Sequence, residues 1–270
     1  MNDSLGSRLE VLHAAPSGPP RSLPVLFVHG AFAAAWCWAE YFLPYFARQG
    51  YECFAVSLRG HGGSEGADRL HLAGLDDYAQ DVMQTVDAIG RAPLLVGHSM
   101  GGAVVRRNLE KGAKVPAAVL LASVPPSGML APSLSMMWRE PKAFLELNVI
   151  QHVNPRFATM ETVRRTLFSD ETSDDVVRKV YQRAQIESHR AIMEMTWPPP
   201  RFHKLLPTHA PLVLGAGADV IFPPHCIEET ARYFETEATF FPGMGHAMML
   251  EARWREVADH ILKWLAARGL

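Results

Sequence analysis

The stretch that decides the fold runs from Pro93 to Val105 and reads PLLVGHSMGGAVV. One apolar run enters the pattern Gly97-His98-Ser99-Met100-Gly101, and a second apolar run leaves it. Such a pattern is typical of a buried strand that turns sharply into a helix and holds one hydroxyl at the apex. A serine hydroxyl is a weak nucleophile unless it is exposed, fixed and placed beside a base. The sequence therefore makes Ser99 a candidate nucleophile.

The same Gly-x-Ser-x-Gly pattern occurs a second time, at Gly62-Gly63-Ser64-Glu65-Gly66. A polar, glycine-rich segment precedes this second copy, and Ala67-Asp68-Arg69 follows it. Because no buried strand enters the pattern and no apolar helix leaves it, Ser64 is interpreted as a loop serine.

The composition is that of an ordinary globular protein with a substantial core: 270 residues, 48% of them hydrophobic and 20% charged. The formal net charge of −2 gives no reason to expect nucleic acid or an anionic membrane as a partner. No secretory signal is recognised in the sequence. No run of 18 apolar residues occurs either, so a membrane span is not expected. The widely spaced Cys37, Cys53 and Cys226 fit neither a disulfide framework nor a zinc site, which favours a cytoplasmic location. The twelve histidines are scattered, so no metal is expected.

Short apolar runs alternate with amphipathic stretches from residue 23 onward. Strands are predicted at Leu23–His29, Tyr51–Leu58, Ala92–Gly97, Ala117–Ser123, Pro211–Gly215 and Ala238–Phe241. Helices are predicted at Leu75–Ile89, Met100–Glu110, Glu228–Phe234 and Glu251–Ala267. This alternation predicts an α/β fold with a mostly parallel central sheet and helices on both faces.

The alternation breaks after Pro125-Pro126 and resumes after Pro207. Between these points no strand signal occurs, while helical patterns are found at Trp138–Leu147, Met160–Phe168, Asp174–Arg183 and Glu187–Met195. We therefore expect a core formed by residues 1–125 and 207–270, with a helical cap inserted at 126–206. The alternative is that these helices simply extend the core.

The predicted insertion is rich in methionine and tryptophan, which together form an adaptable apolar surface. Some of these side chains are expected to line a substrate pocket, although any one of them could instead only attach the insertion to the sheet. The candidate substrate-binding residues are Met129, Met137, Trp138 and Trp197, together with Phe32 from the core.

A nucleophilic serine needs a histidine base, and the base needs a carboxylate that holds its tautomer. In sheets of this kind the acid and then the histidine follow the serine, each on a loop after a later strand. The predicted strand Pro211–Gly215 leads into a glycine-rich loop that ends in Asp219, and a turn-forming role is the alternative for this residue. The last predicted strand leads into Pro242-Gly243-Met244-Gly245-His246. The predicted catalytic residues are therefore Ser99, Asp219 and His246, while the side chain of His98 is expected to point elsewhere.

An oxyanion hole needs two fixed N–H donors, one from the residue after the nucleophile and one from an earlier loop. Met100 supplies the first donor. The earlier loop is Val28-His29-Gly30-Ala31-Phe32, where Ala31 is the predicted second donor and Phe32 is its competitor.

With these residues in place, the chain resembles the α/β-hydrolase superfamily. The resemblance rests on motifs in the expected order: His29-Gly30, Arg59-Gly60-His61-Gly62-Gly63-Ser64, Gly97-His98-Ser99-Met100-Gly101-Gly102, Gly217-Ala218-Asp219 and Gly245-His246. It implies that Ser64 belongs to a structural loop of that superfamily. Ser57 stands where the superfamily usually has an aspartate, a departure outside the catalytic residues.

Within the superfamily, Val28-His29-Gly30-Ala31 followed by Trp36-Cys37-Trp38 looks like the branch of plant-type methylesterases and hydroxynitrile lyases. Those lyases carry a threonine and a lysine where this chain has Ala31 and Ala247, so the esterase side fits better. Haloalkane dehalogenases and epoxide hydrolases have an aspartate at the position of Ser99.

The resemblance implies a cofactor-free serine hydrolase that acts on a carboxylic ester with an apolar acyl or alkyl part, a small-molecule substrate. Two alternatives remain open. The same residues could act on a lactone, thioester, amide or C–C bond, since the pocket and not the fold sets specificity. The chain could also be a ligand-binding protein of this fold with negligible turnover.

Overall fold

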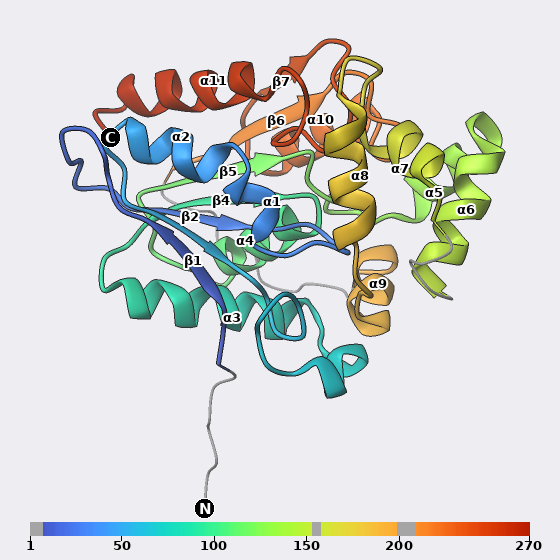
Figure 1. Cartoon of the computed structure of the whole chain (residues 1–270), viewed down its shortest axis with the longest axis horizontal. Coiled ribbons are helices and arrows are strands. Elements are labelled where there is room, and N and C mark those ends of the chain that lie inside the picture. Colours follow the sequence, from blue (N-terminus) through green and yellow to red (C-terminus); the bar gives the residue numbers. More distant parts are fainter. Residues whose placement is uncertain (1–7, 153–157, 199–208) are drawn as a thin grey trace, which may run out of the picture.

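A seven-stranded sheet with the order β1-β3-β2-β4-β5-β6-β7 forms the centre of the protein (Figure 1). The computed structural model describes residues 8–152, 158–198 and 209–270. Within these ranges β1 pairs antiparallel with β3, and the other neighbouring strands pair in parallel. The strands are β1 (Val11–Ala14), β2 (Val25–Val28), β3 (Cys53–Val56), β4 (Leu94–His98), β5 (Ala117–Leu121), β6 (Leu212–Ala216) and β7 (Ala238–Phe241).

Two sets of helices cover the two faces of the sheet, because alternate side chains of a strand point to opposite sides. Phe27 and Val96 belong to one buried cluster, whereas Leu26 and Leu95 belong to the other. The first cluster includes residues of α1 (Trp36–Ala39), α2 (Phe42–Arg48) and α11 (Trp254–Ala266). The second includes residues of α3 (Leu75–Ile89), α4 (Met100–Glu110) and α10 (Pro224–Tyr233). Figure 1 shows α2 and α11 on one side of the sheet and α3 on the other, which confirms the predicted α/β architecture.

Several short elements were not predicted from the sequence. The edge strand β1 is only four residues long and alternates between exposed and half-buried positions, so it lacks the apolar run of a central strand. Helices α1 and α2 are four and seven residues long, and Pro44 interrupts the pattern of α2. A short 3₁₀ helix, η1 (Ala67–Leu72), completes the core. Each of these elements is too short to show a clear helical or strand period.

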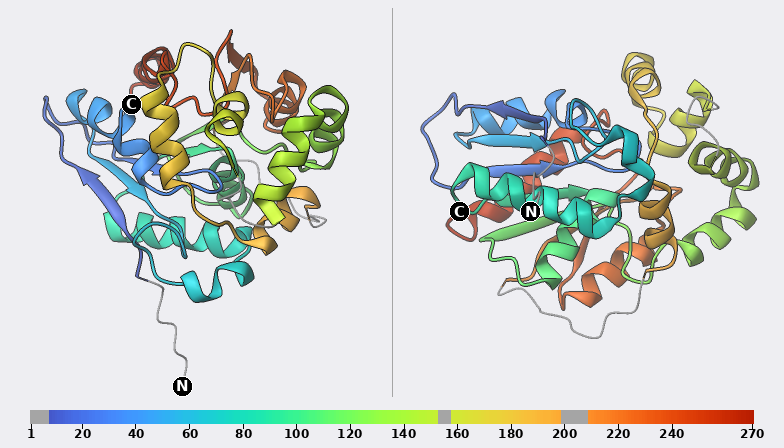
Figure 2. Two further views of the ribbon diagram at one scale, coloured as in Figure 1. Left: turned by 45° about the vertical axis from the view of Figure 1, so that its right-hand side comes forward. Right: turned by 90° about the horizontal axis from the view of Figure 1, so that it is seen from below.

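Five helices lie between β5 and β6 in the described part of the chain: α5 (Leu130–Arg139), α6 (Pro141–His152), α7 (Met160–Leu167), α8 (Asp174–Arg183) and α9 (His189–Thr196). We call them the inserted helices. The single helix predicted at Trp138–Leu147 is wrong, because α5 ends at Arg139 and a separate helix, α6, begins at Pro141. A residue before proline avoids the helical conformation, which explains the break. Figure 2 shows the inserted helices gathered beyond one end of the sheet. The predicted boundary at residues 206–207 lies outside the described residues.

The start of α4 lies very close to the end of β2, and this contact fixes where the central turn sits. A side chain at Gly101 would overlap the backbone carbonyl groups of Val28 and His29. A side chain at Gly102 would likewise press against Ser123, the second residue after β5. The two glycines therefore let α4 begin directly over the ends of three parallel strands. None of the helices in the described ranges is long and apolar enough to cross a membrane.

Candidate active site

Ser99 occupies a strained turn between β4 and α4. Its φ angle is +53°, a left-handed conformation that costs a residue with a side chain about 1–3 kcal/mol. The turn is held because the Ser99 N–H donates to the Leu121 carbonyl at 2.9 Å, and the Ser99 carbonyl accepts from Val124 N–H at 3.3 Å. Gly97 is required at this point, since a side chain there would overlap the backbone of Gly101. This is the strand–turn–helix geometry that the motif predicts.

The side chains of His246 and Asp219 are in hydrogen-bond contact with each other. Asp219 follows β6 and His246 follows β7, and the His246 Nδ1 atom lies 2.7 Å from Asp219 Oδ2. The other oxygen, Asp219 Oδ1, accepts from the N–H groups of Ile221 at 2.8 Å and Phe222 at 3.0 Å. A carboxylate only accepts hydrogen bonds, so Nδ1 carries the proton and Nε2 is left with its lone pair. The buried carboxylate thus fixes both the tautomer and the orientation of the ring.

Ser99, Met100, Ala31 and His246 line one cavity of about 160 Å³. Among the residues that the structure describes, neither Ala31 nor Met100 uses its N–H in a hydrogen bond to another protein group. The peptide unit that carries the Ala31 N–H is fixed, because its oxygen, the Gly30 carbonyl, lies 2.8 Å from Nδ1 of the buried His29. The structure therefore brings the predicted oxyanion donors and the predicted base to the same space as the serine. Phe32, the competing donor, lies next to them with a φ angle of +63°.

The wall of this cavity is apolar. No acidic or basic side chain in the described ranges lines it, apart from the two histidines His98 and His246. Thr162 and Thr166 also line it, but their hydroxyls already donate to the Glu146 carboxylate at 2.9 Å and the Thr162 carbonyl at 2.7 Å. Much of the wall comes from the inserted helices and the segments between them: Leu147, Val163, Leu167, Val180, Ile192 and Met195. No cluster of three potential metal ligands occurs in the described part of the chain.

The structure brings only two of the five predicted substrate-binding residues to the cavity. Phe32 and Met129 line it, whereas Met137, Trp138 and Trp197 do not. Trp138 is 82% exposed, because α5 buries Met136 and a position two residues later lies about 200° around a helix. Trp197 is 69% exposed and follows the last residue of α9, beyond the buried Met195.

His98 contacts His246 directly, contrary to the expectation that its side chain points elsewhere. Its Nε2 donates to the carbonyl oxygen of His246 at 2.9 Å, and the two rings lie 4.8 Å apart. Burial, with the nearby His246, lowers the pKa of His98 to about 3, so the ring stays neutral in the folded protein. The turn motif around His98 could not predict this contact, because His246 lies 148 residues later in the sequence.

Glu251 makes a second contact that the sequence did not reveal, with the loop that carries His246, which we call the histidine loop. Its buried carboxylate accepts from the N–H of Gly245, the residue before His246, at 2.7 Å. It also accepts from the N–H of Ser169 at 2.6 Å and the hydroxyl of Thr172 at 2.6 Å, both between α7 and α8. The predicted helical pattern from Glu251 to Ala267 hid this role, since α11 begins only at Trp254. The carboxylate therefore ties the histidine loop to the inserted helices.

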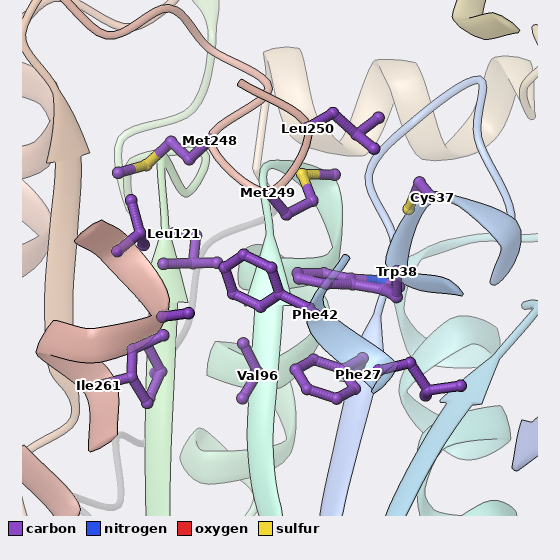
Figure 3. Close-up of a cluster of buried hydrophobic side chains, with 14 of the residues drawn as sticks. Phe27, Cys37, Trp38, Phe42, Val96, Leu121, Met248, Met249, Leu250 and Ile261 are labelled. Atoms are coloured by element: carbon purple, nitrogen blue, oxygen red, sulfur yellow. The ribbon is translucent and has the colours of Figure 1, made fainter. Parts of the chain in front are cut away.

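The residues after His246 are anchored in the core. Met248, Met249 and Leu250 are buried in the cluster that includes Trp38 and Phe42 (Figure 3). Figure 3 shows Met249 beside the rings of Trp38 and Phe42, below the loop. The backbone of His246 is thus held on one side by hydrogen bonds and on the other by apolar packing.

Comparison with known proteins agrees with this fold. The sequence profile of the alpha/beta hydrolase family matches residues 25–260, so the chain belongs to that family. A thermophilic esterase from Thermogutta terrifontis has a similar structure, with a TM-score of 0.73 over 97% of this chain and 94% of that chain, at 22% identity. At this identity the likeness concerns the fold.

Two curated relatives match shorter stretches. Epoxide hydrolase 3 from Xenopus tropicalis is 35% identical over 91 residues, which is 33% of this chain and 24% of that protein. The probable esterase PIR7A from Oryza sativa is 32% identical over 105 residues, which is 38% of this chain and 39% of that protein. The matches thus span less than half the length of either relative.

The low pKa of His98 predicts how stability responds to acid. The unfolded chain takes up a proton near the ordinary histidine value of 6.5, whereas folded His98 does so only near 3. The unfolded state therefore binds more protons between these values, and the free energy of unfolding falls as the pH falls, by about 1.4 kcal/mol per pH unit for this group. We expect the slope between pH 5.5 and 4 to be smaller by that amount in His98→Gln, measured by urea denaturation. Equal slopes in the two proteins would show that folded His98 is protonated in this range.

Proposed function

We propose that this protein is a serine hydrolase that cleaves neutral carboxylic esters through an acyl-enzyme. The observation that carries the proposal is the 2.7 Å hydrogen bond from His246 Nδ1 to Asp219, beside a cavity that Ser99 and His246 share. In this proposal Ser99 is the nucleophile, His246 is the general base and acid, and Asp219 orients the imidazole. The N–H groups of Met100 and Ala31 form the oxyanion hole.

The reaction proceeds in two balanced halves. Ser99 Oγ attacks the ester carbonyl carbon while His246 Nε2 takes its proton, and the carbonyl oxygen becomes an oxyanion between the two N–H donors. The bond to the leaving oxygen then breaks, and the protonated His246 delivers the proton to the departing alcohol. Water then attacks the acyl carbon while His246 Nε2 takes one of its protons. The bond between the acyl carbon and Ser99 Oγ breaks as His246 returns that proton to Oγ, which releases the carboxylic acid and restores Ser99.

The apolar wall supports an uncharged, apolar acyl group as the part of the substrate that enters the cavity. In this proposal residues 126–206 act as a cap, because their helices supply much of that wall. A cytoplasmic location fits the three buried free thiols, Cys37, Cys53 and Cys226. Hydrolysis of an epoxide is disfavoured, since Ser99 stands where epoxide hydrolases have an aspartate. Lactones, thioesters, amides and C–C bonds remain alternatives for the same residues.

Labelling with a fluorophosphonate tests the assignment of the nucleophile. We expect the wild type to be labelled at one serine, and Ser99→Ala to lose both the label and at least about 10³-fold in kcat for a short p-nitrophenyl ester. The matched control is Ser64→Ala, in the second Gly-x-Ser-x-Gly pattern. The Ser64 hydroxyl is buried and donates to the Ser57 carbonyl at 2.6 Å, so its loss should affect stability and leave labelling intact.

The outcome that contradicts this assignment is equally clear. Undiminished labelling of Ser99→Ala, or loss of labelling only in Ser64→Ala, would place the reactive serine elsewhere in the chain.

A charge on the acyl group tests the proposed substrate class. No charged side chain in the described part of the chain lines the cavity to compensate a buried carboxylate, and an unpaired buried charge costs several kcal/mol. We expect kcat/KM for p-nitrophenyl hemisuccinate to lie at least about 100-fold below that for p-nitrophenyl butyrate. The methyl ester of the hemisuccinate, which is larger but neutral, serves as the control and should recover most of the rate. Similar kcat/KM values for the charged and neutral esters would contradict an apolar acyl site.

A further inference from the structure

The loop that carries Ala31, which we call the oxyanion loop, is held in a strained conformation. Phe32, the next residue, has a φ angle of +63°, in the left-handed region that a residue with a side chain rarely adopts. Such a conformation persists only where the surrounding structure over-determines it. His29 fixes the first peptide unit of the loop through the Gly30 carbonyl. Something else must fix the peptide units that carry the Phe32 and Ala33 carbonyls.

Gln185 makes these contacts, from the connection between α8 and α9. Its backbone N–H donates to the Phe32 carbonyl at 3.1 Å, and its side-chain Nε2 donates to the Ala33 carbonyl at 3.2 Å. Its side-chain Oε1 accepts from the N–H of Gly62 at 3.1 Å. One residue of the inserted segment thus holds two consecutive carbonyls of the loop, and its own amide is held by the core.

The connection that carries Gln185 is itself firmly attached to the core. Two residues later, the buried Glu187 lies 3.1 Å from His61 Nε2 and accepts from the Tyr78 hydroxyl at 2.6 Å. The Ser188 hydroxyl donates to the carbonyl of Ala73. The buried hydrogen bonds of Glu187 and Ser188 therefore hold the connection that carries Gln185 in place. Gln185 can for this reason fix the position of the loop that carries Ala31.

We infer that Gln185 is a positioning residue for the oxyanion hole: it holds the strained turn after Ala31, so that the Ala31 N–H faces the carbonyl oxygen of the substrate. This inference rests on the proposed function. Its consequence is that the inserted helices affect the rate of the chemical step as well as binding. A donor that is free to swing away must be reoriented as the oxyanion forms, which weakens binding of the transition state more than binding of the ester.

Kinetics with a transition-state analogue test this inference. We expect Gln185→Leu to lower kcat for p-nitrophenyl butyrate about 10-fold with KM within about twofold of the wild type, because only the transition state loses stabilisation. The trifluoromethyl ketone with the same alkyl chain, which forms an oxyanion on Ser99, should bind about 10-fold more weakly to the variant. The parent alcohol, which forms no oxyanion, should bind both proteins equally.

Lys179→Ala is the matched control. Lys179 also joins the inserted helices to the core, through an ion pair of 2.5 Å with Glu40, but it does not contact the oxyanion loop. Its removal should leave kcat and the affinity for the ketone unchanged. If Gln185→Leu does not fold, the nearly isosteric Gln185→Glu replaces it, since this change keeps an acceptor for Gly62 and sets an oxygen against the Ala33 carbonyl.

Two results would overturn the inference. One is an unchanged affinity for the ketone in the folded Gln185 variant, and the other is an equal loss in Lys179→Ala. Failure of the proposed function looks different, because then the wild type itself would neither react with fluorophosphonate nor bind the ketone as an adduct of Ser99.

Discussion

The close contact between the start of α4 and the ends of the central strands determines where every part of the candidate site can lie. Gly97 and Gly101 leave no room for side chains, and this lets the chain turn within one residue and forces Ser99 into a left-handed conformation. The turn places Ser99 and Met100 at the wall of the cavity. Strain of this kind is tolerated because the neighbouring strands hold the turn through Leu121 and Val124.

The groups that act with Ser99 in the proposed mechanism depend on contacts between the core and the inserted helices. The histidine loop is tied by Glu251 to the segment between α7 and α8, and the oxyanion loop is tied by Gln185 to the segment after α8. Both ties include hydrogen bonds to backbone groups, and neither Glu251 nor Gln185 lines the cavity, so they fix geometry without adding charge to it. The inserted helices therefore line much of the cavity. In our proposals this part of the cavity receives the acyl group, and the same helices hold parts of the catalytic machinery.

The sequence predicted the elements that bear a strong local period. The bounds of α3, α4 and α8 agree with prediction, because apolar side chains recur at helical spacing along α3 and glycine or proline punctuation marks several ends. It did not predict β1 or the break at Pro141. The contacts of His98, Glu251 and Gln185 could not be predicted either, since each joins segments that are distant along the chain. Trp138 and Trp197 were expected in the pocket because of their type, but residue type alone does not say which face of a helix meets the core.

The role of Ser99 as the nucleophile is tested most directly by locating the acyl group of the trapped intermediate. The protein is mixed with p-nitrophenyl butyrate, quenched in acid within the first turnover, digested with trypsin and analysed by mass spectrometry. We expect one butyryl group on the peptide Ala92–Arg106, at Ser99. A butyryl group on Gly60–Arg69, which carries Ser64, or the formation of nitrophenol with no acylated peptide at any time, would contradict it.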